Sequence, residues 1–581
     1  MTGVQTCALP ICLTKLGAPQ FPLANSYNTT FEPDALGTCT LGDTIFAGQG
    51  RFTGTPDGTQ SNPYRSIAQA VSIAANDGTI NCVVVMPGEY VTPIYLDQDN
   101  VSLLSLNDVT NVTFPQSIIH VAGMYDAGDY TASIGYQTAS GVERPTFANR
   151  AGLYIEDATN LIVSGFSFTP SSVHDSTLFD TRRPVMMFNS TNSALNNSTF
   201  GASSIDATSY SAWGIGQTPI TVITGTGNSF EGNRFLNNTG GYVGTQQSTP
   251  SIMFVEGTNT SSMVFRNNRI ENNTAINAGA VTQDQFWPTL AYALNTDVAF
   301  VGNIVLSNTA GTLFTSVTNG TTTPDTVRLV SNIFQNNTLQ AQTETGTAIP
   351  SGPIAHAYYT FDLTFSNNNV VVNDLGNSGA FAAVVARGDR SPTTVTSNND
   401  GSFTGSNQQF DLNNNLIYNN TMSAGVYTDP SVSFSFCDSL VGSTNQATRN
   451  NWFNASGSLG SCSTAMNSNG NVLSDPSNEF LGSTSGSLSP TLDPQYYALR
   501  FFQINVQYSA GMDYSDVDLS NVGGGSDSYS TYPYNVDARG DGRIIDIDNW
   551  EDGNHTDTGT LLYDVGAYEF DILDIIDTST R

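Results

Sequence analysis

The segment FEGNRF begins at Phe230, and related segments follow at steps of 35 residues, FRNNRI from Phe265 and FVGNIV from Phe300. In each segment an apolar residue is followed three positions later by Asn and two positions further on by a second apolar residue. Self-similarity at a fixed period predicts a solenoid whose units pack on their neighbours. Further copies are LVSNIF from Leu329, FSNNNV from Phe365, LNNNLI from Leu412, and weaker ones from Leu161, Leu195 and Thr448.

The spacing within each repeat favours strands, because no amphipathic stretch of ten or more residues lies between the anchors. We therefore expect each repeat to form one coil of a parallel β-helix, with coils about 4.8 Å apart. The apolar anchors should point inward, and Asn at the bend can adopt the left-handed conformation that other residues resist. A second Asn cluster follows each anchor, as at Asn237–Asn238 and Asn272–Asn273. Stacked copies should bond amide to amide along the axis.

The composition supports strands joined by polar turns, since only 12% of the 581 residues are charged and 53 are Gly. The net charge of −32 argues against nucleic acid as a partner, because binding requires phosphates to be neutralised by Lys and Arg. It also disfavours an anionic polymer unless divalent cations bridge the two. No run of 18 apolar residues occurs, so we expect no transmembrane helix.

The N-terminus has an unusual sequence. Residues 1–11, MTGVQTCALPI, resemble a translated sequencing adapter, and we exclude residues 1–12 from the fold. This interpretation implies a gene truncated at its 5′ end. The lack of a recognisable signal peptide then does not bear on where the protein acts.

Four cysteines remain after the adapter-like segment: Cys39, Cys82, Cys437 and Cys462. An even number without metal-ligand spacing predicts disulfides and an oxidising compartment. A Cys39–Cys82 bond would tie the N-terminal segment to the first strand, and a Cys437–Cys462 bond would close a local loop. The alternative is free, buried thiols.

The segment from Gly54 to Val91 has the pattern of a capping element. Asn62 and Pro63 are typical of a helix start, and Asn76-Asp77-Gly78 of its end. The run Val83–Met86 should be the first strand. Between the predicted start and end of the helix, apolar residues recur at helical spacing, at Ile67, Ala70, Val71 and Ala74.

With its GT…NP…PGxY pattern, this segment resembles the N-terminal cap of the pectate-lyase-like β-helix superfamily. The resemblance implies an all-β fold, a right-handed parallel β-helix with a short N-terminal capping helix and a C-terminal capping module. The segments Asp537–Arg543 and Asp564–Glu569 are similar to the choice-of-anchor Q module of bacterial surface β-helices. The expected division is an N-terminal segment and cap over 13–80, coils over 81–470, the anchor-like module over 471–570 and a tail over 571–581.

Catalytic groups are scarce in the repeats. A polygalacturonase-like hydrolase uses paired aspartates that lie within four short motifs. Only the Asn-Thr-Asp motif is present, at Asn295-Thr296-Asp297, and we interpret it as a chance match. A polysaccharide lyase needs a base, and the only lysine, Lys15, lies outside the coils. The candidates, in one long turn, are Arg182 and Arg183 with Asp180 and His174; the alternative is a solvated turn with ion pairs.

Two further sets of residues are candidate binding groups. Trp213 and Trp287 could stack on sugars, although packing in the core or in turns is the alternative. Asp537, Asp541 and Asp548 match positions 1, 5 and 12 of a calcium loop, with Arg539 at the third position where an oxygen ligand belongs. Calcium is therefore the cofactor that this spacing would hold.

The sequence predicts a secreted or cell-surface protein that functions in adhesion or carbohydrate binding, with a polysaccharide or cell-surface glycan as its partner. The alternative is a polysaccharide lyase or other carbohydrate-active enzyme that acts on a uronate-containing polymer. Because the repeated residues account for a scaffold, we expect any activity to lie in the irregular turns between the anchors.

Overall fold

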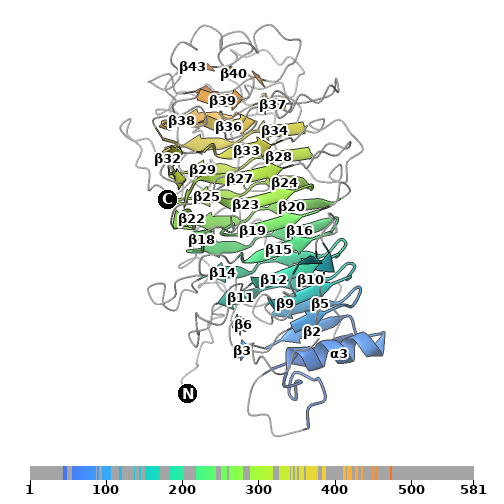
Figure 1. Cartoon of the computed structure of the whole chain (residues 1–581). Coiled ribbons are helices and arrows are strands. Elements are labelled where there is room, and N and C mark those ends of the chain that lie inside the picture. Colours follow the sequence, from blue (N-terminus) through green and yellow to red (C-terminus); the bar gives the residue numbers. More distant parts are fainter. Residues whose placement is uncertain are drawn as a thin grey trace, which may run out of the picture.

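The computed structural model shows a column of stacked β-coils with one helix at its N-terminal end (Figure 1). The residues that it describes are 43–48, 55–86, 88–90, 94–105, 117–120, 136–137, 143–144, 151–169, 183–201, 218–243, 250–257, 261–278, 288–317, 326–340, 342–344, 347–349, 352–358, 362–376, 383–387, 410–413, 415–421, 425–429, 434–435, 448–449, 452–453 and 472–473. The adapter-like segment and the proposed anchor module lie outside these residues.

Each coil contributes one strand to each of three long sheets, which we call sheets 1, 2 and 3 in the order in which a coil passes through them. Sheet 1 has 11 described strands, all parallel except β40. They are β4 (Ile94–Leu96), β9 (Ala151–Glu156), β12 (Arg183–Phe188), β15 (Ile220–Ile223), β19 (Met253–Glu256), β23 (Thr289–Leu294), β27 (Thr312–Val317), β33 (Ala355–Tyr358), β36 (Ala383–Arg387), β39 (Gly425–Asp429) and β40 (Phe434–Ser435).

Sheets 2 and 3 each have 12 described strands. Sheet 2 contains β1 (Thr44–Ala47), β2 (Cys82–Val85), β5 (Ser102–Ser105), β10 (Ile162–Ser164), β13 (Ala194–Asn196), β16 (Asn228–Glu231), β20 (Ser262–Arg266), β24 (Asp297–Val301), β28 (Thr326–Val330), β34 (Asp362–Ser366), β37 (Phe410–Asn413) and β41 (Thr448–Arg449). Sheet 3 contains β3 (Gly88–Tyr90), β6 (Ser117–His120), β11 (Phe166–Thr169), β14 (Thr199–Gly201), β17 (Arg234–Leu236), β21 (Arg269–Glu271), β25 (Ile304–Leu306), β29 (Ile333–Gln335), β35 (Asn369–Val371), β38 (Leu416–Tyr418), β42 (Trp452–Phe453) and β43 (Val472–Leu473).

Shorter strands complete the described part of the fold. Sheet 4 follows sheet 3 in four coils, and two antiparallel pairs lie outside the stack of long sheets. The strands of sheet 4 are β18 (Thr239–Val243), β22 (Thr274–Ala278), β26 (Thr309–Ala310) and β30 (Thr338–Leu339). The pairs are β7 (Tyr136–Gln137) with β8 (Glu143–Arg144), and β31 (Gln342–Glu344) with β32 (Thr347–Ile349). The predicted right-handed parallel β-helix is confirmed.

The apolar anchors form the core of the column, as predicted. Phe230, Phe265 and Phe300 face one another in register on β16, β20 and β24, and each is at most 3% exposed. The Phe230 and Phe265 ring centroids are 4.8 Å apart, which is the stacking distance set by the coils. A second column, with Phe200 and Phe235 rings 5.0 Å apart, lies behind sheet 3. Burial of each such ring stabilises the coil by roughly 1.5–3 kcal/mol.

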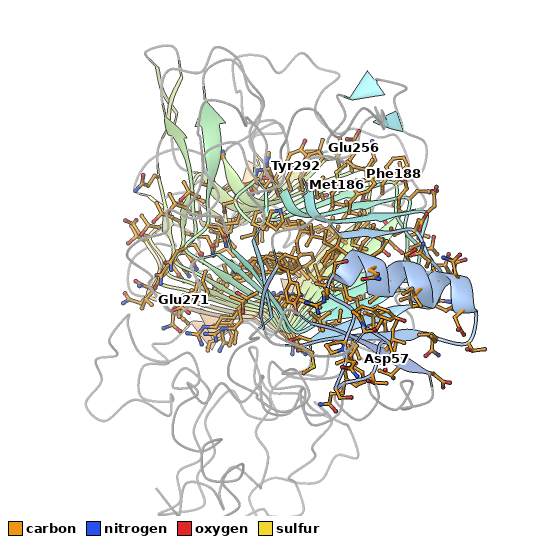
Figure 2. The ribbon with its side chains drawn as sticks, turned by 90° about the horizontal axis from the view of Figure 1, so that it is seen from below. Asp57, Met186, Phe188, Glu256, Glu271 and Tyr292 are labelled. Carbon is orange, nitrogen blue, oxygen red and sulfur yellow. The ribbon has the colours of Figure 1, made fainter. Side chains whose placement is uncertain are left out.

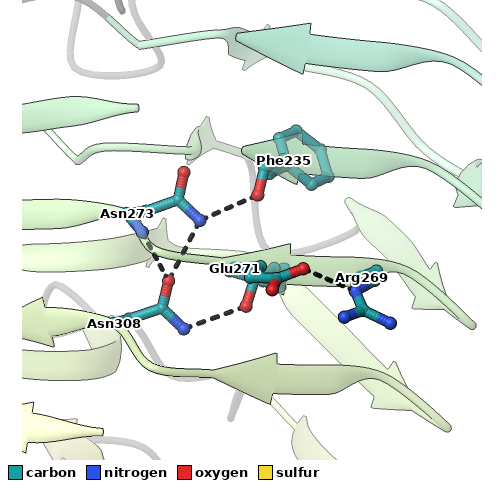
Figure 3. A network of polar contacts seen from close by, with 6 residues as sticks. Phe235, Arg269, Glu271, Asn273 and Asn308 are labelled. Atoms are coloured by element: carbon teal, nitrogen blue, oxygen red, sulfur yellow. Dashed lines mark hydrogen bonds and ion pairs between the residues drawn. The ribbon is translucent and has the colours of Figure 1, made fainter. Parts of the chain in front are cut away.

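Two ladders of buried Asn side chains border sheet 3. In the second ladder, the Asn273 backbone N–H and the Asn273 Nδ2 both donate to Oδ1 of Asn308, over 2.8 and 3.0 Å. Nδ2 also donates to the carbonyl of Phe235, one coil back, over 2.9 Å (Figure 3). The same bond from backbone N–H to Oδ1 joins Asn233, Asn268, Asn303, Asn332, Asn368 and Asn415 in the first ladder, and Asn238, Asn273, Asn308, Asn337, Asn373 and Asn420 in the second.

The structure corrects one detail of these turns. The predicted left-handed conformation belongs to the residue before the ladder Asn, and the ladder Asn itself is a separate, buried position. Gly232 has φ 64° before Asn233, and Asn272 has φ 55° before Asn273. In one coil this position is occupied by Val372, with φ 52°. A β-branched side chain is poorly suited to this region, so the Val372 turn is strained.

The N-terminal cap differs from its prediction at its start. Helix α3 (Ile67–Asp77) is capped by Ser66, whose Oγ accepts from the Gln69 N–H over 3.1 Å, and it therefore begins after Pro63. Asn62 instead belongs to a turn and donates its N–H to the Thr59 carbonyl. The predicted end is confirmed, because Gly78 has φ 70°. The apolar helix face packs on the core through Ile67, Ala70, Val71 and Ala74.

The first described strand also precedes the predicted one. Strand β1 pairs in parallel with β2 and places Thr44 opposite Cys82, so the stack begins before the helix. Cys82 is disulfide-bonded, while Cys39, Cys437 and Cys462 lie outside the described residues. In the described part of the chain, no helix is long and apolar enough to cross a membrane.

The strained turn gives a test of the fold. We expect Val372→Asn to stabilise the protein by about 1 kcal/mol, because Asn tolerates the left-handed conformation better than a β-branched residue. Val372 is only partly buried, so little apolar burial is lost. The measurement is the urea midpoint of unfolding. The matched control is the reverse change, Asn336→Val, at the equivalent turn of the adjacent coil; we expect it to destabilise. A lower midpoint for Val372→Asn would contradict the assignment of strain.

Candidate functional site

Most of the residues singled out from the sequence lie outside the described part of the chain. These are Arg182, Asp180, His174, Trp213, Trp287, Asp537, Asp541 and Asp548. Arg183 is the first residue of β12 in sheet 1 and pairs with Ala151 of β9. The Asn295-Thr296-Asp297 tripeptide forms a corner between β23 and β24. There Asn295 has φ 50° and Asp297 Oδ1 accepts from the Thr326 N–H over 2.6 Å.

The outer face of sheet 1 carries a continuous set of aromatic and apolar side chains. Alternate residues of a strand point to opposite faces, so the inward row of Ile155, Met187 and Val222 joins the main core. Between these inward residues, Tyr154, Met186 and Ile223 form a separate apolar cluster, against which Phe188 and Phe254 pack. We call these five residues, together with Tyr292, the aromatic strip. Figure 2 shows Met186, Phe188 and Tyr292 on one side of the column, outside the ribbon.

The centre of the strip is a stacked pair of rings. Phe254 of β19 and Tyr292 of β23 face each other in register, with centroids 5.7 Å apart and planes inclined by 8°. Both side chains are partly exposed, although neighbouring residues in the same row are buried. A flat, partly exposed stack can accept the apolar face of a ligand without rearrangement, since large aromatic side chains offer contact area with few rotatable bonds.

Hydroxyl groups flank the stack along the axis. Thr221 lies in register with Phe254 on one side, and Thr315 with Tyr292 on the other. Both residues are 0% exposed, and among the described side chains they are two whose hydroxyl oxygen has no hydrogen-bond partner. Buried polar groups are nearly always hydrogen-bonded, so these two hydroxyls are exceptions. Because neither residue is exposed, a ligand on the stack would bond them only after the groups that cover them move aside.

Ionisable groups complete the same face. His356 continues the row beyond Thr315, and Glu256 lies two residues after Phe254 on β19. Both are buried, whereas Glu156, in the row of Phe188, is half-buried. A mainly apolar surface with a few fixed polar groups is typical of ligand sites. Within the described ranges, no three His, Cys, Asp or Glu side chains gather as a metal site.

A buried ion pair lies on the outer side of sheet 2. The guanidinium of Arg266 donates to the carboxylate of Glu231, which faces it from the preceding coil. Burial raises the pKa of Glu231 to about 7, although the charge and hydrogen bond of Arg266 act in the opposite direction. On its other side, Glu231 faces the neutral amide of Asn196. Of these two neighbours, only Arg266 therefore opposes the effect of burial on the pKa of Glu231.

The strip was missed from the sequence because its members differ from one coil to the next. The row through its centre contains Tyr154, Met186, Thr221, Phe254 and Tyr292, and no two neighbours in this row are of the same residue type. The available signal was alternation within each strand, as in MFVE from Met253 and TLAYAL from Thr289, where an aromatic residue stands between core positions.

Comparisons with known proteins add little to this geometry. No protein-family model matches the sequence, and no curated protein matches it either. Similar solved structures include a surface adhesin of Streptococcus pneumoniae, at 12% identity over 58% of this chain and 83% of the adhesin, with a TM-score of 0.28. Another is a pectin methylesterase in complex with a hexasaccharide, at 12% identity over 57% and 78% of the two chains, with a TM-score of 0.26.

A third similar structure is the A-module of a mannuronan C-5 epimerase from Azotobacter vinelandii. It is 12% identical over 71% of this chain and 92% of the module, with a TM-score of 0.24. Similarity at this level is too distant to indicate an activity.

The Glu231 carboxyl predicts a pH dependence of stability. Its folded-state pKa of about 7 exceeds the ordinary 4.5, so between these values the unfolded chain ionises first and stability is lost as the pH rises. We expect Glu231→Gln, which does not titrate, to gain up to about 3 kcal/mol relative to the parent protein between pH 4 and pH 8. Urea unfolding at both pH values measures this difference.

The matched control for this experiment is Glu271→Gln, which also removes one ion-paired carboxylate, but from a more exposed position. An equal gain in the control, or no gain for Glu231→Gln, would show that burial of Glu231 is not the cause.

Proposed function

We propose that this protein binds a carbohydrate chain along the outer face of sheet 1. The observation that carries the proposal is the partly exposed stack of Phe254 and Tyr292, flanked by the unsatisfied hydroxyls of Thr221 and Thr315. Aromatic rings pack against the apolar face of a sugar, while hydroxyl and carboxylate groups hydrogen-bond its edge. The ligand would run along the axis, because equivalent positions recur about every 4.8 Å.

A single-stranded nucleic acid is the other ligand that stacks on aromatic rings. Such binding also needs a positively charged groove that follows the phosphates. The net charge of −32 and the carboxylates of Glu156 and Glu256 beside the strip oppose it. A carbohydrate fits both the rings and the charge.

We further propose that the protein acts outside the cell, either secreted or at a cell surface, in adhesion or carbohydrate binding. The disulfide at Cys82 supports an oxidising compartment. Attachment through a choice-of-anchor Q-like module, and calcium held by Asp537, Asp541 and Asp548, are proposals that rest on the sequence alone.

A polysaccharide lyase is the second candidate, favoured by one observation. Arg183 begins β12, the strand that carries Met186 and Phe188 of the aromatic strip. Arg183 is therefore close along the chain to the strip, although alternation along β12 assigns its position to the side of Val185 and Met187. Arg182, Asp180 and His174 precede it closely in sequence. The proposed reaction is abstraction of a proton next to a uronate carboxylate.

Binding is tested with the full chain on a glycan array, followed by titration calorimetry with the strongest glycan. We expect Tyr292→Ala and Phe254→Ala to weaken binding about tenfold each, because each removes one ring of the stack. Tyr292→Phe should stay within about twofold of the parent if stacking dominates. The control is Leu236→Ala, a half-buried apolar residue of sheet 3. Retention of no glycan, or unchanged affinity in both Ala variants, would refute the proposal.

Catalysis is tested by the ultraviolet absorbance of unsaturated products on a panel of uronate polymers, with and without calcium. If the lyase candidate holds, we expect product from at least one polymer and a loss of about a hundredfold or more in rate for Arg183→Ala. Glycan affinity should change little in that variant. Absence of product from every polymer, or full activity of Arg182→Ala and Arg183→Ala, would exclude this mechanism and leave the binding proposal intact.

A further inference from the structure

The outward side of sheet 3 changes in character part-way along the column. One outward row runs through the strands from β17 to β38 and contains, in order, Arg234, Arg269, Ile304, Ile333, Asn369 and Leu416. The next residue along each strand, such as Val305 or Phe334, points into the core, so this row points away from it. The two arginines are partly exposed, whereas every member from Ile304 onward is at most 2% exposed.

Sheet 2 changes at the same coil. Its outward row contains Arg266 on β20, followed by Val301 on β24 and Val330 on β28. The Arg266 side chain is 25% exposed, whereas Val301 and Val330 are 4% and 0% exposed. Only two residues separate Val301 from Ile304, so the buried parts of the two rows adjoin at the turn between sheets 2 and 3.

Six apolar residues share this combination of burial and outward position. They are Val301, Ile304, Val330, Ile333, Val371 and Leu416, each at most 4% exposed, and we call them the outer apolar face. None belongs to the main core, although the residues that alternate with them, such as Phe300 and Val370, do. In the described part of the chain, the strands that carry this face make their main contacts with neighbouring strands of the same sheet. Because these exposed fractions are those of a single chain, the cover belongs to this chain itself.

The turns that border the face are too short to cover it. Gly302 and Asn303 alone connect β24 to β25, and Ser331 and Asn332 alone connect β28 to β29. The turns that follow β25 and β29 have the same length. Residues 1–42 lead into β1, which lies at the far end of sheet 2, several strands away from β24.

The C-terminal segment, residues 474–581, has the length and the starting point to reach the face. It is the longest stretch outside the described ranges, and it follows β43, which belongs to the same sheet as β25, β29, β35 and β38. Its sequence FQINV, from Phe502, alternates apolar and polar residues. This alternation is typical of a strand with one apolar side, and such a side needs an apolar partner.

We propose that the outer apolar face is the docking surface of the chain's own C-terminal segment. Docking removes apolar surface of both partners from water, which is the dominant favourable term in such contacts. Without this cover, the face would be a contiguous apolar patch of the kind that promotes association or aggregation. A second copy of the chain is not required, because the face is already buried in one chain.

This contact leaves the aromatic strip free, and it does not rest on the carbohydrate proposal. Glu271 lies on the outward side of sheet 3, in register with Leu306 of β25. Figure 2 shows Glu271 on a different side of the column from Tyr292 of the strip. Anything attached through the C-terminal segment would therefore hold the column from the side of sheets 2 and 3 and leave sheet 1 accessible.

Photo-cross-linking in the full chain identifies what covers the face. A small diazirine amino acid is introduced in place of Ile333, and mass spectrometry identifies the peptide that it captures in the monomer. We expect this peptide to come from residues 474–581. The matched control carries the same amino acid in place of Leu236, a half-buried outward residue in the row of Val371 that lies before the change in character. Capture of the C-terminal peptide should be lost there.

Hydrogen exchange tests the contribution of the side chain. Ile333→Gln should speed amide exchange within residues 474–581 about tenfold, because the lost apolar contact loosens the docked segment. Exchange in β19 and β23 of sheet 1 should stay unchanged, which separates undocking from unfolding of the column. Leu236→Gln is the control, and it should leave exchange of the C-terminal segment within about twofold of the parent.

Four results would overturn the inference. Capture only between two chains would assign the face to a second copy, and capture of a peptide from residues 388–409 would assign it to a connection between sheets 1 and 2. Reaction of the diazirine with water alone would show that the face is uncovered. Equal exchange of the C-terminal segment in Ile333→Gln and Leu236→Gln would show that the face does not hold it.

Discussion

The amide-to-amide hydrogen bond between Asn side chains of successive coils is the interaction on which the remaining structure depends. It fixes the register of each coil independently of the length of the connecting loop. The bond from Nδ2 to Oδ1 measures 2.9, 3.1 and 3.1 Å where the partners are 35, 29 and 47 residues apart, as in Asn268–Asn303, Asn303–Asn332 and Asn368–Asn415. Because these amides are buried, an unmade bond would cost the full desolvation of a polar group. Loops between the sheets can therefore vary in length and sequence while the strands stay aligned.

Alignment of the strands is what turns distant residues into candidate sites. Phe254 and Tyr292 are separated along the chain by one complete coil, and so are Ile304 and Ile333, yet each pair meets in register. The inward half of every strand is committed to the core, which leaves the outward half free to vary. Sheet 1 uses this freedom for rings, hydroxyls and carboxylates, whereas sheet 3 uses it for charged residues in some coils and for an apolar face in others. The repeat thus supplies positions, and the departures from the repeat supply chemistry.

The sequence predicted the parts of the molecule that repeat. Phe230, Phe265 and the ladder Asn residues recur because every coil needs the same ring and the same amide at the same place. Sequence could not separate the left-handed turn residue from the ladder Asn, since both are often Asn, as at Asn272–Asn273. The placement of any activity in the irregular turns stays a prediction, and the aromatic strip is a separate candidate that lies on regular strands. The strip is visible only once register is known, because neighbouring residues of its central row, such as Met186 and Thr221, share no chemical pattern.

The ladder also has a consequence for how this molecule can change in length. A coil joins the one before it and the one after it through the same bonds, so removal or duplication of a complete coil moves everything beyond it by one step without exposing a mismatched surface. Each added coil would also extend the outer face of sheet 1 by one position. A longer column would then grip a long ligand at more points at once, and avidity could rise without any improvement of a single contact. In such a protein, the number of coils would set the strength of binding.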